Sequence, residues 1–197
     1  MKTKVNKLAV VLALLVLTVA PAFAQSYQVD TNASTVKWTG KKVAGSHHGT
    51  IALKEGELEM KGNQLIGGSV VVDMTTIKDL DLTDPEWNQK LVGHLRSNDF
   101  FGVEKFPVSR LVIKKVESKG GNLYHVTGDL TIKGITKPVE FDSSILVTGN
   151  KLEATGTIPV DRTKYGIKYG SGSFFSNLGD KMIDDVFTLD FSLVAHQ

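Results

Sequence analysis

The sequence of 197 residues contains no cysteine, and this absence excludes several kinds of protein. There is no thiol to act as a catalytic nucleophile, and there is no cysteine to carry the lipid of a bacterial lipoprotein. Disulfide bonds are excluded as well, so the hydrophobic core has to hold the fold together without covalent cross-links.

The common catalytic and nucleotide-binding motifs are also missing. No Gly-x-Ser-x-Gly elbow occurs, and the nearest run, Gly170 to Ser173, has the wrong spacing. The sequence has no phosphate-binding loop, no dinucleotide fingerprint and no His-Glu-x-x-His pair. These absences disfavour the corresponding enzyme classes, and we expect no cofactor.

Long apolar runs are scarce. The longest, Leu8 to Ala20, spans 13 residues, whereas a membrane-spanning helix needs about 20. Lysines precede this run and Ala22-Phe23-Ala24 follows it, which is the three-part layout of a secretory signal peptide. We expect residues 1–24 to be a signal peptide cleaved after Ala24, residues 25–197 to form one domain, and the product to be periplasmic or secreted.

The chain also lacks a strong charge of either sign. It has 23 basic and 21 acidic side chains, and three of the basic ones, Lys2, Lys4 and Lys7, lie in the expected signal peptide. Without them 20 basic side chains remain against 21 acidic ones, a net charge of −1. No basic surface is left to attract nucleic acid, so we expect no nucleic-acid partner.

The feature that the sequence does have is a repeated two-residue alternation of apolar and polar side chains. Near the C-terminus Phe187, Leu189, Phe191 and Leu193 alternate with Thr188, Asp190 and Ser192. Successive side chains of a β-strand point to opposite faces, so this pattern predicts a strand with one apolar face. The same rhythm recurs at Val36 and Trp38, at Ile51 and Leu53, at Val70, Val72 and Met74, at Tyr124, Val126, Leu130 and Ile132, at Val139, Phe141, Ile145 and Val147, and at Leu152, Ala154, Ile158 and Val160.

About eight such strands at short spacing predict an all-β protein, either an up-and-down antiparallel barrel or a sandwich. Phe106 and Val108 have the opposite parity to Leu111 and Ile113, which predicts a bulge near Ser109 and Arg110.

Two segments interrupt the β pattern. Asp84 and Pro85 predict a helix start, and Trp87, Leu91 and Leu95 give the short helix one apolar stripe. The glycine-rich segment from Tyr169 to Asp180 is expected to be a loop at a barrel mouth, with Phe174 and Phe175 turned inward.

Several sequence blocks resemble those of the YceI family, in family order and across nearly the whole expected mature chain. The blocks are Trp38 to Thr50, Val72 to Met74, Leu91 to Phe101, Glu104 to Pro107, Val126 to Val139 and Asp161 to Ile167. The resemblance implies an extended antiparallel eight-stranded, lipocalin-like β-barrel with a short helix inserted between strands. It also implies a periplasmic protein that binds a polyisoprenoid, an isoprenoid quinone or a fatty amide, with no established catalytic activity.

A barrel interior is either a packed core or a pocket for an apolar guest, and the residues by themselves leave this open. With the resemblance, we expect a pocket for an isoprenoid or acyl lipid, in a monomer or homodimer. The apolar pocket residues are expected to be Trp38, Ile51, Leu53, Val72, Met74, Phe106, Tyr124, Val126, Phe141, Phe187, Leu189 and Phe191. Outward charges such as Lys37 and Asp190 disfavour an outer-membrane barrel, so we expect no stable membrane insertion.

The polar head group of a ligand would need polar partners at one end of the pocket. The candidates are His47, His94, Arg162, Tyr165 and Lys168. For Arg162 a structural ion pair is an equally good reading, since a buried guanidinium often has an acidic partner. The alternative function is a secreted metal-dependent hydrolase or isomerase that uses His47, His94 and a carboxylate, although scattered histidines without ligand spacing favour no metal site.

Overall fold

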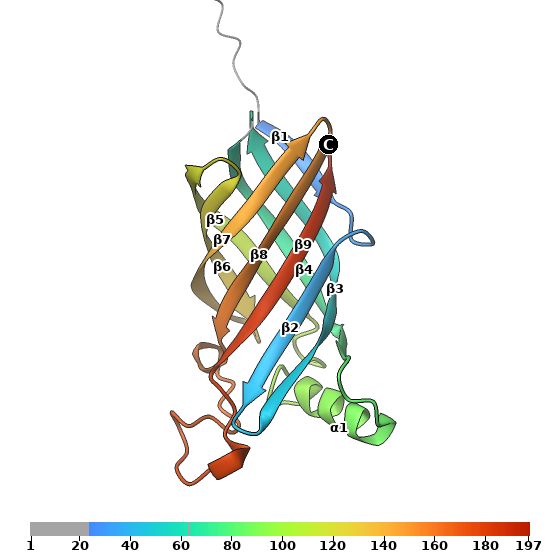
Figure 1. Cartoon of the computed structure of the whole chain (residues 1–197), viewed down its shortest axis with the longest axis vertical. Coiled ribbons are helices and arrows are strands. Elements are labelled where there is room, and N and C mark those ends of the chain that lie inside the picture. Colours follow the sequence, from blue (N-terminus) through green and yellow to red (C-terminus); the bar gives the residue numbers. More distant parts are fainter. Residues whose placement is uncertain (1–23, 63) are drawn as a thin grey trace, which may run out of the picture.

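The structure is a computed structural model, and it describes residues 24–62 and 64–197 as one elongated β-barrel (Figure 1). The signal-peptide prediction therefore lies outside the described residues, apart from Ala24, where the first strand begins. The strands are β1 (Ala24–Val29), β2 (Thr35–Lys42), β3 (Gly45–Lys61), β4 (Gln64–Asp79), β5 (Val108–Gly120), β6 (Leu123–Ile132), β7 (Ile135–Thr148), β8 (Lys151–Asp161) and β9 (Val186–His196). The helices are α1 (Pro85–Arg96) and two short 3₁₀ turns, η1 (Arg162–Tyr165) and η2 (Gly179–Lys181).

The barrel closes with eight strand positions, all antiparallel, as the sequence predicts. From β2 to β9 each strand pairs with the next one in the sequence, and β9 pairs back onto β2. The ninth strand, β1, adds no position, because it lies beyond the end of β2 in the same gap between β3 and β9. A closed barrel leaves no unpaired edge along its wall, which protects so strand-rich a protein from edge-to-edge association.

The end of the barrel beside β1 is filled by side chains. Tyr27, Met60, Leu152 and Ala195 are almost completely buried there, on strands that neighbour one another. Each large apolar side chain that is fully buried contributes about 1.5–3 kcal/mol to folding. These side chains therefore close the β1 end of the barrel.

Helix α1 lies at the opposite end of the barrel, below β3 and β4 in Figure 1. The Asp84 carboxylate accepts hydrogen bonds from the backbone N–H groups of Glu86 and Trp87, so it caps the helix as predicted. On α1, Leu95 is buried, whereas Trp87 is 59% exposed. The apolar stripe expected from the sequence therefore does not include Trp87. Among the residues that the structure describes, no helix is long and apolar enough to cross a membrane.

The bulge expected near Ser109 is not present, and this prediction was wrong. β5 begins at Val108 and pairs with β4 in unbroken register as far as Ile113. Phe106 precedes the strand, and Val108 faces outward, so neither belongs to the inward-facing set. The first register shift of β5 against β6 falls after Ile113 instead.

Gly49 on β3 lies tightly against β4 and provides a test of the register between these two strands. A Cβ atom at Gly49 would lie 1.8 Å from the carbonyl oxygen of Lys78 and 2.8 Å from the ring of Trp38. We expect Gly49→Ala to lower the free energy of unfolding by about 2–3 kcal/mol, because backbone atoms have to move. Gly40→Ala is the matched control, since nothing lies within 4 Å of its added Cβ. Equal denaturation midpoints for the two variants would contradict the expected clash.

Candidate ligand-binding cavity

A cavity of about 180 Å³ lies inside the barrel, lined by side chains from every strand of β2 to β9. A single water needs only about 10–15 Å³, so the space accommodates a much larger molecule. An apolar ligand that fills it would bury its own apolar surface together with that of the lining side chains.

One group of lining side chains differs from the rest in its burial. Several inward-facing apolar residues are only partly buried, although they sit within the barrel wall. They are Val72 on β4, Leu111 and Ile113 on β5, and Phe187, Leu189 and Phe191 on β9. These side chains combine incomplete burial with a position in the cavity lining, so we expect them to contact a bound ligand.

Ten of the twelve residues expected to form the apolar pocket line this cavity. They are Trp38, Ile51, Leu53, Val72, Met74, Val126, Phe141, Phe187, Leu189 and Phe191. Two of the rings, Phe141 and Phe191, meet edge to face with centroids 5.7 Å apart, which fixes their orientation. That these residues contact a ligand stays a prediction.

Phe106 and Tyr124 do not belong to the cavity lining. Phe106 packs beside Gly102 and Gly134, because it precedes β5 and never enters the barrel wall. Tyr124 is buried in the barrel, opposite Ser143 of β7, but does not reach the cavity lining. In their stead Phe100 and Phe101, from the segment after α1, line the cavity. No alternation marks these two residues in the sequence, because they do not lie in a strand.

Arg162 lines the cavity, but its guanidinium donates hydrogen bonds to backbone carbonyl groups of the protein. It is 3% exposed, and its guanidinium donates to the backbone carbonyl oxygens of Ile167, Tyr169, Ile183 and Asp184 at 2.8–3.0 Å. A carboxylate oxygen of Asp185 lies 3.6 Å away. Burial lowers the pKa of Arg162 from its ordinary value, and the nearby Asp185 charge opposes that effect. These contacts favour a structural role for Arg162 over contact with the head group of a ligand.

The other expected head-group residues lie outside the cavity lining. Tyr165 is 1% exposed, its hydroxyl has no hydrogen-bond partner among the described residues, and burial raises its pKa to about 12. His94 packs edge-on between the rings of Phe100 and Tyr169. Lys168 is exposed, and its ammonium group lies 4.5 Å from the ring centroid of Phe174.

The mouth loop differs from its expected arrangement. Phe174 and Phe175 are 47% and 52% exposed rather than turned inward. The backbone N–H groups of both residues donate to the carbonyl oxygen of Ser171, so a tight turn points the rings away from the barrel.

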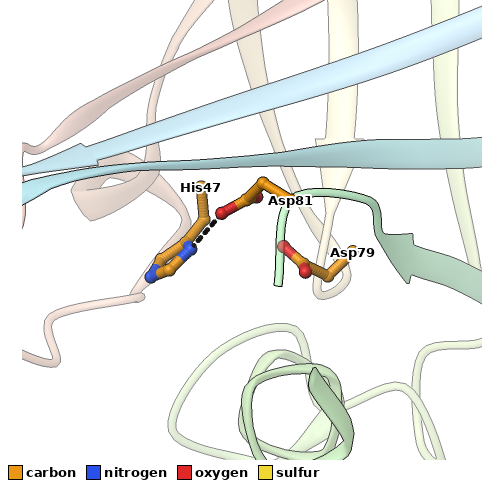
Figure 2. Close-up of side chains that lie close together, drawn as sticks. All are labelled: His47, Asp79 and Asp81. Atoms are coloured by element: carbon orange, nitrogen blue, oxygen red, sulfur yellow. Dashed lines mark hydrogen bonds and ion pairs between the residues drawn. The ribbon is translucent and has the colours of Figure 1, made fainter. Parts of the chain in front are cut away.

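His47 and His94 do not meet around a shared carboxylate. His47 contacts Asp81 instead, with 2.8 Å between the ring nitrogen Nδ1 and a carboxylate oxygen, and Asp79 lies beside them (Figure 2). Burial acts to raise the pKa of Asp81, but hydrogen bonds from the His48 N–H and the His47 ring outweigh it and lower the pKa to about 2. Burial raises the pKa of Asp79 above its ordinary value.

A closed antiparallel barrel around one apolar cavity is the architecture of proteins that enclose small apolar molecules. The comparisons with known proteins agree with this class. The chain matches the model of the YceI-like domain over residues 27–195, and it belongs to the YceI-like family.

Relatives with curated sequences are UPF0312 proteins. One from Pseudomonas putida is 30% identical over 139 residues, covering 69% of this chain and 70% of that protein. One from Photorhabdus laumondii is 45% identical over 56 residues, covering 28% and 29%. A Shewanella denitrificans protein is 28% identical over 130 residues, covering 63% and 65%. The chain thus spans less than two thirds of two of these relatives.

Solved structures share the fold at low sequence identity. BcnA of Burkholderia cenocepacia superposes with a TM-score of 0.66 at 23% identity, covering 85% of this chain and 99% of BcnA. A Saccharophagus degradans protein described as a polyisoprenoid binding domain gives a TM-score of 0.63 at 12% identity, covering 86% and 97%. These likenesses confirm the barrel fold.

Proposed function

We propose that this protein is a carrier or scavenger that holds one long-chain amphiphile inside its barrel. The observation that carries the proposal is the cavity of about 180 Å³, whose lining is almost entirely apolar. Membership of the YceI-like family and the fold shared with a polyisoprenoid binding domain support the same ligand class. The ligand would be a polyisoprenoid, an isoprenoid quinone or a fatty amide.

The energetics favour recognition of the tail. Each buried methylene contributes about 0.8 kcal/mol, so ten carbons supply about 8 kcal/mol, which corresponds to a micromolar dissociation constant before the costs of association. An apolar pocket discriminates a single methylene by only about 1–3 kcal/mol. Chain length would therefore be selected loosely, by the depth of the cavity as far as the packed β1 end.

We propose that the end of the barrel where α1 and the loop before β9 lie is its open end, so the head group would remain there (Figure 1). Since the Arg162 guanidinium already donates hydrogen bonds to backbone carbonyl oxygens, the binding free energy would come mainly from the tail. A soluble carrier of this kind would act after secretion, in the periplasm or outside the cell, as the N-terminal sequence suggests.

The direct test is native mass spectrometry of the protein isolated from the periplasm of its own cells, followed by organic extraction. We expect one bound molecule per chain that is released on denaturation and identified as an isoprenoid or acyl compound. A bare polypeptide mass, together with no uptake of added isoprenoid or fatty amide, would contradict the carrier function.

A further inference from the structure

A second group of polar side chains lies outside the cavity, at the junction of the barrel and α1. It consists of His47 on β3, Asp79 at the end of β4 and Asp81 in the segment that leads to α1 (Figure 2). Pairing of β3 with β4 brings these residues together, and the Leu80 N–H donates to the His48 carbonyl oxygen to hold the segment in place. One potential ligand atom from each of the three lies within 4.8 Å of the others.

The hydrogen bonds of this group leave one oxygen without a donor. Asp81 accepts from the His48 N–H at 2.7 Å and contacts the His47 ring at 2.8 Å. One oxygen of Asp79, Oδ1, accepts from the Leu82 N–H and from the amide of Asn88. The other, Oδ2, is completely buried and has no hydrogen-bond partner in the described part of the chain. Asp79 itself is only 6% exposed.

An unpartnered buried carboxylate oxygen is costly, and here a second carboxylate lies beside it. In Figure 2 the Asp79 carboxylate points toward the space bordered by His47 and Asp81. A positive charge in that space would satisfy Asp79 Oδ2 and relieve the repulsion between the two acids.

We propose that His47, Asp79 and Asp81 form a binding site for a divalent cation of the zinc class. Imidazole nitrogen and carboxylate oxygen are both ligands of Zn²⁺, which is usually four-coordinate, so three protein ligands leave the fourth position to water. The imidazole disfavours Ca²⁺ and Mg²⁺, which prefer oxygen ligands. Ligand atoms on one Zn²⁺ lie about 3.3 Å apart. A pair at the 4.8 Å limit therefore has to close by about 1.5 Å, whereas the His47 and Asp81 atoms, now 2.8 Å apart, have to separate slightly.

The site would connect three parts of the open end of the barrel. His47 belongs to the β2–β3 hairpin, Asp79 ends β4, and Asp81 precedes the cap of α1. Asn88 of α1 donates to the Asp79 side chain and to the carbonyl oxygens of Asp79 and Leu82, so the helix is tied to the same group. A bound cation would therefore fix α1 against the barrel, whether or not the cavity holds a lipid.

The test uses the full mature chain without an affinity tag, stripped with a chelator and then titrated with Zn²⁺ alone. We expect one Zn²⁺ per chain by elemental analysis and calorimetry, and no comparable binding of Ca²⁺ or Mg²⁺. At a free Zn²⁺ concentration of about 100 times Kd, the melting temperature should rise by about 5–10 °C.

Variants locate the site. His47→Gln and Asp79→Asn should each weaken Zn²⁺ binding by more than about 100-fold, because loss of an outer-shell partner already costs 10–100-fold. His125→Gln is the matched control, since His125 also contacts an aspartate, Asp142, at 2.9 Å but belongs to no three-ligand group among the described residues. His47 is partly exposed, so its variant should remain folded even if the Asp79 variant does not. A wild-type chain that binds no Zn²⁺, or a folded His47→Gln variant that binds it fully, overturns the proposal.

Discussion

Leu189→Trp is expected to weaken lipid retention by about 100-fold while the barrel stays folded. Leu189 lines the cavity on β9 and is only partly buried, so the larger ring can extend into free space rather than into packed atoms. An indole in that space would displace three to four methylenes of a bound chain. At about 0.8 kcal/mol for each, the loss is about 2.5–3 kcal/mol, which is about 100-fold in affinity.

Ser192→Trp provides the matched control for this variant. Ser192 is exposed on the same strand and faces outward, so the same ring is added to the outside of the barrel. Lipid uptake should be measured for both variants by native mass spectrometry, and folding by the far-ultraviolet circular dichroism of each. If the folded Leu189→Trp variant retained lipid as well as Ser192→Trp does, the cavity would not be the binding site.

The barrel wall could be predicted because strand periodicity is two residues. Along β9 the pattern of Phe187, Leu189 and Phe191 fixes which side chains face inward without any knowledge of the neighbouring strands. Phe106 shows the limit of this reasoning. In the sequence, Phe106 continues the apolar alternation, but in the structure it lies before the start of β5. Alternation does not mark where a strand begins.

The His47–Asp79–Asp81 group could not be predicted from the sequence. His47 and Asp81 are 34 residues apart, and their contact depends on the register of β3 against β4. That register shifts three times, and the first shift, between Thr50 and Ala52, moves the pairing by several residues. Local pattern carries no information about such long-range shifts, so the sequence does not reveal that His47 meets Asp79 and Asp81 rather than His94.

Arg162 illustrates a second limit. Its position after a strand, near a barrel mouth, is compatible with both a head-group contact and a structural role. The structure shows that its partners are backbone carbonyls, and any residue type supplies a carbonyl, so no side-chain motif could reveal them.

Arg162→Ala is expected to lower the free energy of unfolding by about 3–5 kcal/mol, because it leaves four carbonyls and the Asp185 carboxylate without their buried cation. Arg162→Lys should cost less but remain destabilising, since one ammonium group cannot reach all four carbonyls. Arg110→Ala is the control, because Arg110 is exposed and its ion pair with Glu55 should contribute less than about 1 kcal/mol. Chemical denaturation of the three variants gives this order directly. If Arg162→Lys instead kept wild-type stability and lost only its affinity for lipids with a charged head group, Arg162 would be a ligand contact. The loop from Gly166 to Asp185 would then need another anchor.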